Sequence, residues 1–585
     1  MSTVGIDIGT ASVRVCYSAF DTGLYTSFAS DIEVSNDNSF ITQSSIEIFE
    51  KILSMLEKIP SDFKSISVTA TCSMVLLEKI ERNSTFFLKP FSCDYKQSKT
   101  YNDVLLWMDN RAVDESRFLN KILDTELLGV LGGNIIPEMG LPKIKSVSDK
   151  FPDKKLIAFE LYDWITYLLL VGGFTSEKLV PFNDFENDYD EDSMALDGSI
   201  KGWSSKFLER IGVGIQIGKA EFGSEKLLKR LNPIGIPIGR VHENITENEV
   251  IVCNGCIDCY AGWAATLLRN PSVYSNNLSM IAGTSTCFIL STTKLFAPIP
   301  GIWGPFEQLV DMDIKLFEFG QPATGKLFET LFADFSDIIE AQLSVDCYKE
   351  NMLKLFEMLE METAKLEAKR KCSIHEVIKY YFYYGDTFGN RSPYNDHSMG
   401  ETIIDGANAS YSLPSVMHLS NMTSLVIRYN LIIEFLCFQL MQILDIIKEH
   451  NGTAIDTVII SGSQADNTRF ISLLTSMLSI PVTKILHPPS KYNVVRGSSI
   501  ISLIGYKVEI NHLSYSELLK QSIETASQVV KIQTFNPEKD DVSGVSEKTN
   551  LDIKGKRILF QKYNIFLDMA ANQRRYREMI NSISN

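Results

Sequence analysis

The sequence predicts a mixed α/β protein built from two halves that begin in the same way. The first half opens with VGIDIGTASVRV and the second with MIAGTSTCFIL, and each phrase has two apolar runs around a Gly-Thr pair. Apolar runs that flank such a turn are typical of a β-hairpin. Strands and helices follow in both halves, and we therefore expect a duplicated α/β fold with one Gly-Thr hairpin in each copy.

The first half is expected to extend from residue 1 to residue 270. Its pattern predicts strands over 4–8, 13–18, 27–33 and 65–78, a helix over 45–58, a mostly helical region over 113–185, and a buried strand over 249–258 that leads into another helix. The first helix carries Ile48, Ile52 and Met55 on one face, which is the spacing of an amphipathic helix. The polar stretch NDFENDYDEDSMALDGS is expected to be a solvated loop.

A segment with Pro, Ser and Asn, LRNPSVYSNN over 268–277, predicts the hinge between the halves. We expect the second half over 278–510 and a C-terminal extension over 511–585. The elements expected in the second half are a hairpin over 279–292, long helices near 336–368 and 422–449, a strand over 457–462, a helix over 467–478, a strand at VTKIL and a helix over 495–505. In the extension we expect a disordered stretch over 534–552 and a final helix that contains FLDMAANQRRYREMI.

The composition predicts a cytoplasmic protein that contacts neither nucleic acid nor membrane. The 585 residues include 72 acidic and 56 basic ones, a net charge of −16, without a long basic block. The apolar stretches ITYLLLVGGF and NLIIEFLCFQLMQILDII are short or interrupted by Glu434 and Asp445, and a membrane span needs about 18 uninterrupted apolar residues. MSTVGIDIG leads directly into a strand without the pattern of a signal peptide.

The ten cysteines show no disulfide framework, which is typical of free thiols in a reducing compartment. CNGCIDC sets Cys253, Cys256 and Cys259 at a spacing similar to that of iron–sulfur ligands. No fourth cysteine follows nearby, and Cys253 ends the apolar run VIVC. We therefore favour three small core residues over a cluster.

The two hairpins could grip a polyphosphate from opposite sides. Turn glycines let the backbone approach an anion, and successive N–H groups and hydroxyls donate to phosphate oxygens. Gly-Thr-Ser is also common turn chemistry, so neither hairpin alone is specific. Asp7 lies inside the first strand, where a carboxylate is costly to bury without a partner. Beside a phosphate it could hold Mg²⁺ through water, and the alternative is a carboxylate that caps the turn.

The stretch GQPATGKLF over 320–328 matches only part of a P-loop. Leu327 stands where that motif needs Ser or Thr for Mg²⁺, and Pro322 removes a backbone donor. We therefore reject a Walker motif, although the glycines could still border a nucleotide.

Several phrases together resemble the FGGY family of carbohydrate kinases, most closely its ribulokinase-like branch. They are GIDIGTASVR, TATCSMVLLE, LLWMDNRA, MGLPKIK, GWSSKFLERIG, GCIDCYAGW, IAGTSTC, GIWGPF, GQPATGKL, FGNRSPYND and SGSQADN, in this order from residue 4 to the terminal helix. The resemblance implies an actin/hexokinase-like (ribonuclease H-like) ATPase fold, duplicated, in which ATP and sugar meet in a cleft between two lobes. It also implies ATP and Mg²⁺ as cofactors.

The resemblance implies an ATP-dependent kinase of a ketopentose, D-ribulose first, which gives the 5-phosphate and ADP. Asp258 matches the general base of the family, and it ends a buried strand, where α/β sites are commonly built. The alternative is that Asp258 caps the helix that begins with CYAGWAA.

The resemblance assigns the sugar to WMDNRA and the nucleotide to the glycine-rich turns. In an extended segment Trp107, Asp109 and Arg111 share one side, and Asn110 stands where the family often has His. Alone, this segment would be interpreted as a surface strand. The residues implied to hold ATP are Gly9, Thr10, Ser12, Arg14, Gly283, Thr284, Gly320, Gly325, Gly462, Ser463 and Gln464, with Asp7 on the metal side.

Departures from the family pattern leave the substrate open. Thr69 replaces an acid that is common in the branch, and Ser463 and Pro322 are also unusual. The alternatives are a kinase of xylulose or of a polyol such as ribitol, and a catalytically weak protein that senses ATP or sugar. An actin- or chaperone-like ATPase would share the hairpins but not LLWMDNRA or FGNRSPYND. We expect a monomer or homodimer.

Overall fold

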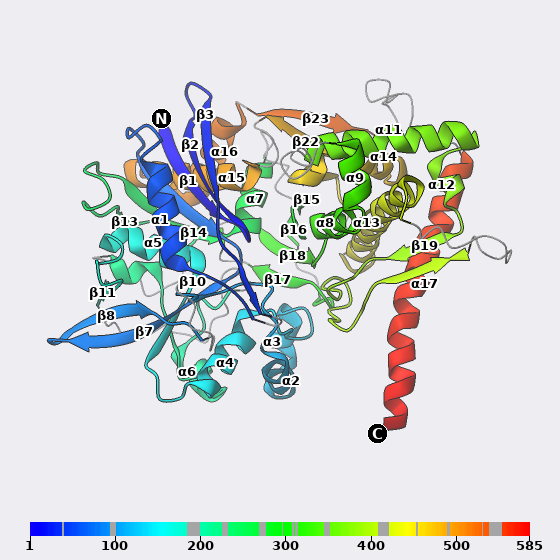
Figure 1. The fold of residues 1–585 in the computed structure, drawn as a ribbon. Coiled ribbons are helices and arrows are strands. Elements are labelled where there is room, and N and C mark those ends of the chain that lie inside the picture. Colours follow the sequence, from blue (N-terminus) through cyan, green and yellow to red (C-terminus); the bar gives the residue numbers. More distant parts are fainter. Residues whose placement is uncertain are drawn as a thin grey trace.

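The structure is a computed structural model of a two-lobed protein (Figure 1). It describes residues 1–37, 40–93, 101–183, 199–224, 232–267, 276–294, 297–306, 309–310, 314–343, 352–406, 420–451, 454–487, 492–528, 530–536 and 553–584. Most of the predicted polar loop and of the predicted hinge, and residues 537–552 of the predicted disordered stretch, lie outside these ranges, while Thr534 and Phe535 end a strand.

The first lobe contains a six-stranded sheet in the order β13-β14-β6-β1-β2-β3. Its strands are β1 (Ser2–Ile8), β2 (Ser12–Ala19), β3 (Leu24–Asp31), β6 (Ser65–Ala70), β13 (Pro237–Arg240) and β14 (Ile251–Ile257). The predicted first hairpin is confirmed, since β1 pairs with β2 in antiparallel register. Strands β1, β6 and β14 are parallel, so their carboxyl ends meet at one edge. That edge faces the second lobe and carries the candidate site.

A second sheet completes the first lobe. Its strands are β4 (Ser35–Asp37), β5 (Phe40–Gln43), β7 (Met74–Arg82), β8 (Thr85–Pro90), β9 (Val104–Leu105), β10 (Leu156–Glu160), β11 (Val180–Phe182) and β12 (Gln216–Ile217). The surrounding helices are α1 (Ser45–Leu56), α2 (Val113–Ile122), α3 (Thr125–Val130), α4 (Gly140–Lys150), α5 (Leu161–Val171), α6 (Ser205–Arg210) and the short η1 (Ala220–Gly223). The region 113–185 is thus less helical than predicted, because LIAFE forms β10 and pairs with β7.

The second lobe repeats the topology of the first. Its seven-stranded sheet has the order β17 (Trp303–Phe306), β18 (Lys315–Gln321), β16 (Thr286–Thr292), β15 (Asn277–Ala282), β21 (Thr457–Ser461), β22 (Val482–His487) and β23 (Lys531–Phe535). Strand β15 pairs with β16 in antiparallel register and with β21 in parallel register, as β1 does with β2 and β6. The predicted second hairpin and the predicted duplication are therefore confirmed.

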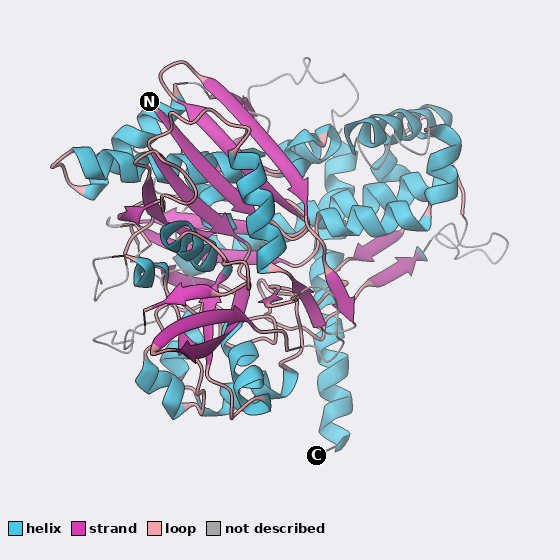
Figure 2. Cartoon of the chain, turned by 60° about the vertical axis from the view of Figure 1, so that its left-hand side comes forward, coloured by secondary structure: helices cyan, strands magenta, loops and turns pink. Residues whose placement is uncertain are grey.

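Helices gather on the outer side of the second lobe (Figure 2). They are α8 (Gly325–Asp334), α9 (Ser336–Gln342), α11 (Met352–Arg370), α12 (Ile374–Val377), α13 (Met422–Asn451), the short η5 (Ser463–Asp466) and α14 (Thr468–Met477), beside a small sheet of β19 (Tyr381–Tyr384) and β20 (Thr402–Asp405). Contrary to the expectation from its charged residues, α13 is long and apolar enough to cross a membrane. However, 83% of its apolar window is buried, so α13 is the core helix of this lobe.

After β22 the chain returns to the first lobe. The prediction of a second half that extends to residue 510 does not include this return. Helix α15 (Asn493–Ile510) packs against α7 (Asp258–Thr266) and against strands β1 and β6. A Cβ atom at Gly497 would lie 1.8 Å from the carbonyl oxygen of Ala261, so only glycine allows this close approach. Helix α16 (Tyr515–Ser527) packs on α15, and β23 then joins the second sheet.

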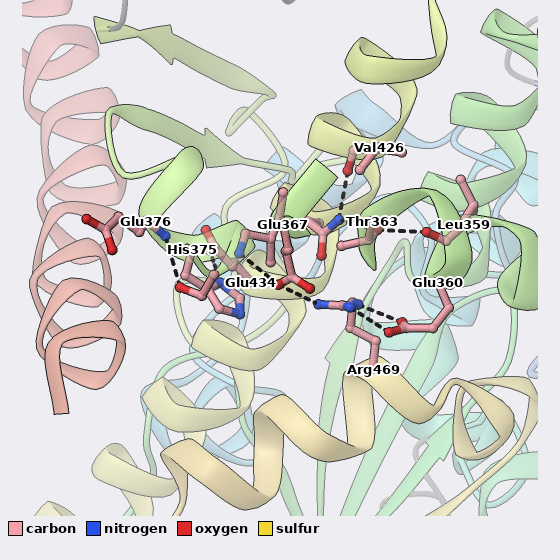
Figure 3. Close-up of polar contacts among 12 residues, drawn as sticks. Leu359, Glu360, Thr363, Glu367, His375, Glu376, Val426, Glu434 and Arg469 are labelled. Carbon is pink, nitrogen blue, oxygen red and sulfur yellow. Dashed lines mark hydrogen bonds and ion pairs between the residues drawn. The ribbon is translucent and has the colours of Figure 1, made fainter. Parts of the chain in front are cut away.

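The final helix, α17 (Ile553–Ser584), is longer than predicted and begins against the second lobe. Lys562 forms a buried ion pair with Glu434 of α13. The other carboxylate oxygen of Glu434 contacts His375 Nδ1 at 2.6 Å (Figure 3). Nearby, Arg469 of α14 binds both carboxylate oxygens of Glu360 (Figure 3). The far end of α17 projects beyond the body of the protein (Figure 1).

Candidate active site

A cavity of about 450 Å³ lies between the lobes, and both Gly-Thr hairpins line it. The first lobe contributes residues 9–12 with Asp7, Arg14 and Asp258, and the second contributes residues 283–285 and 462–464. A cavity of this size suits a small-molecule ligand. The residues that the sequence placed in two separate halves thus meet around one space.

Asp7 and Arg14 form an ion pair at the base of the first hairpin. The two residues are opposite in the β1–β2 register, and Arg14 Nη1 donates to Asp7 Oδ2 at 2.9 Å. The carboxyl group is buried and its Oδ1 has no hydrogen-bond partner. Burial raises the pKa of Asp7 more strongly than Arg14 lowers it. A buried carboxylate oxygen that faces a polar cavity is a fitting partner for a hydrated Mg²⁺ ion.

Asp258 begins α7 at the carboxyl end of β14. The cap residue of this helix is Ile257, and it makes no side-chain capping bond, so Asp258 lies one position inside the helix. Burial, together with the negative charges of Asp7 and Glu318, raises the pKa of Asp258 to about 7. A carboxyl group with such a pKa can exchange protons near neutral pH.

The second hairpin is held by the start of α8. The N–H groups of Thr324 and Lys326 donate to the carbonyl of Thr284, and that of Gly325 donates to the carbonyl of Gly283. These donors of GQPATGK therefore bind the hairpin, which explains in physical terms why the phrase is no P-loop. A Cβ atom at Gly325 would lie 2.7 Å from the oxygen of Gly283.

The turn after β21 forms another wall of the cavity. Gly462 has φ of +89°, and a Cβ atom there would lie 2.3 Å from the carbonyl oxygen of Ala282. Ser463 Oγ donates to the same carbonyl at 3.5 Å, and Gln464 also lines the cavity. Phe328 and Phe356 add an apolar wall that the sequence analysis missed.

Gly320 lies apart from the other glycines that were predicted to hold ATP. It lies in β18 opposite Cys287 and does not line the cavity. A Cβ atom at Gly320 would lie 2.8 Å from Cδ of Arg391, so this glycine makes room for the arginine.

Only one residue of WMDNRA that was predicted to bind sugar lines the cavity. Trp107 does so, and its Nε1 donates to Thr10 Oγ1 at 3.0 Å. Asp109 is buried outside the cavity, where its oxygens accept from the N–H of Ile41 at 2.8 Å and from Arg111 at 2.7 and 2.8 Å. Asn110 is exposed and also lies outside the cavity lining. Asp109 and Arg111 therefore stabilise the segment from outside the cavity.

Lys143 of α4 fixes the position of Trp107. Its ammonium group is buried and donates to the carbonyls of Leu106 and Trp107 at 2.7 and 2.8 Å. Burial lowers the pKa of Lys143 to about 8, although Asp109 and other acids oppose this shift. Backbone acceptors thus take the place of a carboxylate partner.

Arg391 of the second lobe is a site residue for which the sequence analysis assigned no role. Its guanidinium lies 4.9 Å from the ring of Trp107 and 5.8 Å from that of Trp303. It also donates to both carboxylate oxygens of Glu138, at 2.5 and 2.9 Å. Arg391, Glu138 and Trp303 all line the cavity. Their phrases lie far apart in the chain, so their spacing carries no signal of this contact.

Glu318 of β18 lies near Asp258 and was also missed. It is buried, and its Oε2 accepts from the hydroxyl of Tyr260 at 2.7 Å. Its charge contributes to the raised pKa of Asp258. Thr69, where the family pattern has an acid, is buried away from the cavity lining and donates to the carbonyl of Ile6 at 3.1 Å.

Comparisons with known proteins agree with this geometry. Residues 278–495 match the FGGY family of carbohydrate kinases, C-terminal domain. Protein MPA43 of Saccharomyces cerevisiae is 29% identical, covering 99% of this chain and 98% of that protein. A D-ribulokinase of the same yeast is also 29% identical, covering 82% of this chain and 68% of that protein. The crystal structure of xylulose kinase from Rhodospirillum rubrum aligns with a TM-score of 0.64 over 98% of this chain and 99% of that one, at 13% identity.

These matches confirm the predicted resemblance to carbohydrate kinases and the predicted two-lobed fold. The phosphotransferase class predicted for the chain is confirmed at the level of the family.

Proposed function

We propose that this chain is a carbohydrate kinase of the FGGY type, whose C-terminal domain its residues 278–495 match, and that it phosphorylates D-ribulose with ATP, giving D-ribulose 5-phosphate and ADP. The observation that carries the proposal is Asp258, a half-buried carboxyl group with a pKa of about 7 that lines the same cavity as the two Gly-Thr hairpins. The choice of D-ribulose is supported by a relative that is named a D-ribulokinase.

In this proposal Asp258 is the general base. The C5 hydroxyl oxygen of the sugar attacks the γ-phosphorus, the bond from that phosphorus to the bridging oxygen breaks, and its electron pair leaves with ADP. The hydroxyl proton passes to the carboxylate of Asp258. Phosphoryl transfer depends mostly on positioning and charge neutralisation, so one well-placed carboxylate is sufficient on the protein side.

The phosphate groups would lie between the two hairpins. Thr10 and Ser12 supply hydroxyl groups on one side, Gly283 and Thr284 supply backbone and hydroxyl donors on the other, and Arg14 adds positive charge. Mg²⁺, when bound, neutralises phosphate charge, and the free oxygen of Asp7 would hold it through water.

The sugar would lie beside Trp107, Trp303 and the Arg391–Glu138 pair. The indole rings offer apolar faces to the carbon chain, while the guanidinium donates to sugar oxygens and the carboxylate accepts from hydroxyl groups. Charged groups held together across the lobes suit a small polyhydroxylated substrate.

The test is ADP release by the purified protein with Mg-ATP across D-ribulose, L-ribulose, D-xylulose, ribitol and glycerol. We expect the highest kcat/KM with D-ribulose. Highest turnover with D-xylulose or ribitol would contradict the choice of sugar but leave the kinase intact. ATP binding without turnover on any of these compounds would contradict the enzyme and favour a sensing protein.

A further inference from the structure

Two thiols and a carboxyl group that the proposed phosphoryl transfer does not use as ligands come together in the wall of the cavity. Cys259 is the second residue of α7, Cys287 lies in β16 and Glu318 in β18. The two Sγ atoms and one carboxylate oxygen all lie within 4.8 Å of one another. All three residues line the cavity, so a small ion can reach them.

The strand register explains how β16 and β18 supply two of these groups. Cys287 is opposite Gly320, and Glu318 is opposite Ile289, so Cys287 and Glu318 are diagonal neighbours on one face of the sheet. Helix α7 packs against β16 and brings Cys259 to the same place. This group is different from the cysteine pattern that the sequence suggested. Cys253 and Cys256 lie in β14, and Cys253 Sγ donates to the carbonyl of Ser502.

Two sulfur atoms and one carboxylate oxygen are a donor set that suits zinc. A tetrahedral ion with Zn–S bonds of about 2.3 Å and Zn–O bonds of about 2.0–2.2 Å holds its ligand atoms roughly 3.5–4 Å apart. The three ligand atoms lie within 4.8 Å of one another, so rotation of the side chains would have to bring them closer. Zinc sites with three protein ligands keep a fourth position open, and here that position would face the cavity.

The surroundings of the carboxylate fit a ligand role. Tyr260, next to Cys259, donates from its hydroxyl to Glu318 Oε2 at 2.7 Å. Such a contact orients a ligating carboxylate.

We propose that Cys259, Cys287 and Glu318 bind Zn²⁺, and that the bound ion joins α7 of the first lobe to β16 and β18 of the second. Because the site adjoins Asp258, the bound ion would place positive charge beside the proposed base and so weaken it as a proton acceptor. Binding itself does not depend on the proposed kinase activity.

Cobalt(II) is the probe that tests the site directly. The full-length protein, reduced and freed of metal, is titrated with Co²⁺ in the absence of substrates, and then Zn²⁺ is added. We expect one equivalent of Co²⁺ to give sulfur-to-cobalt charge-transfer bands and intense visible bands of tetrahedral cobalt, and Zn²⁺ to abolish both. Absence of these bands would overturn the proposal, and so would a Cys259–Cys287 disulfide that persists under the reducing conditions.

Variants assign the ligands. Cys287→Ser and Glu318→Gln should each weaken Zn²⁺ binding by at least about tenfold, since even outer contacts of a metal site have effects of that size. Cys372→Ser, which changes a partly exposed thiol outside the cavity lining, is the control and should bind Zn²⁺ as the unchanged protein does. Cobalt bands that persist unchanged in Cys287→Ser would overturn the assignment. Thermal unfolding of the metal-free variants shows whether each is folded when its binding is measured.

Discussion

At the scale of single residues, the environment of Asp258 predicts a pH dependence. Burial and the charges of Asp7 and Glu318 raise its pKa to about 7, and a base must be deprotonated to accept a proton. We therefore expect kcat/KM to be constant above pH 8 and to fall about tenfold per pH unit below pH 6. The measurement is the rate of ADP release from pH 5 to pH 9 at constant ionic strength. A profile without a break between pH 6 and pH 8 would contradict the role.

Glu318 provides a second check on the same group. Because its negative charge contributes to the raised pKa of Asp258, Glu318→Gln should move the break in the pH profile to lower pH. The position of the break is independent of any change in the maximal rate. A break that stays in place would show that Glu318 does not act on the base.

Lys143 is predicted to position Trp107. Lys143→Met leaves the carbonyls of Leu106 and Trp107 without their buried donor, which costs about 1–3 kcal/mol. We expect kcat/KM for the sugar to fall about five- to a hundredfold while the KM for ATP stays unchanged. Lys145→Met on the same helix is the control, since Lys145 pairs with the exposed Asp149 and lies over the ring of Phe118, and it does not line the cavity. Equal effects of both variants in steady-state kinetics would argue against positioning.

Individual site residues were predictable from the sequence where the contact is local. The register of the hairpin brings Asp7 and Arg14 together, and this hairpin could be recognised from its apolar runs and its glycine. The hydrogen bond from the N–H of Ile41 to a carboxylate oxygen of Asp109 could not be predicted, because the spacing of Asp109 from Trp107 gives no information on it. Arg391 was not assigned because Glu138 lies 253 residues away in the chain.

At the scale of elements, the contact between α15 and α7 depends on Gly497. A Cβ atom there would lie 1.8 Å from the oxygen of Ala261, and such overpacking costs about 1–3 kcal/mol or more. Gly497→Ala should lower the free energy of unfolding by this amount, measured by urea denaturation. Gly400→Ala, where no atom lies within 4 Å of the added Cβ, should change it by less than about 0.5 kcal/mol. Equal stability of the two variants would contradict the packing.

The anchoring of α17 depends on a buried charge pair. Glu434→Gln leaves the buried ammonium group of Lys562 without its counter-charge, and breaking such a pair costs about 3–5 kcal/mol. We expect a large loss in the free energy of unfolding. Asp114→Asn removes an exposed pair with Arg117 and should cost at most about 1 kcal/mol. A Glu434→Gln protein as stable as this control would show that the pair does not anchor the helix.

Most helices and strands could be predicted from the sequence because their apolar patterns are local. The elements against which they pack could not be predicted in this way. LIAFE was included in a helical region, although its pairing with β7 makes it a strand. The small residues of α15 predicted a helix, yet nothing in its own pattern tells that it packs on the first lobe. Glycines on both elements allow this packing. Gly497 lies on α15, and at Gly5 of β1 a Cβ atom would lie 2.4 Å from the N atom of Ser499.

At the scale of the whole molecule, hydrogen bonds outside the cavity lining hold the lobes together. Asn395 Nδ2 donates to the carbonyls of Gly132 and Asn134 at 3.1 and 2.7 Å, and the N–H of Gly301 donates to Gly132 at 2.8 Å. Asn395 has φ of +47°, a conformation that Asp also tolerates. This contact can therefore be removed without backbone strain.

Asn395→Asp replaces a donor with a carboxylate that faces two carbonyl oxygens. We expect faster hydrogen exchange over 131–134 and 391–395, and a kcat/KM about tenfold lower, because closure of the lobes excludes water from the reaction. Asn83→Asp is the matched control, since Asn83 is exposed and has φ of +50°. Unchanged exchange in Asn395→Asp would show that these bonds do not hold the lobes closed.

The most direct measurement for the central claim is ADP release with D-ribulose by Asp258→Asn, with ATP binding measured on the same preparation. Asn is nearly the same size as Asp but cannot accept the proton at the working pH. The account predicts that kcat falls about a hundredfold or more while ATP affinity is retained. A kcat within a fewfold of that of the unchanged protein, with ATP bound equally well, would contradict the assignment of Asp258 as the base.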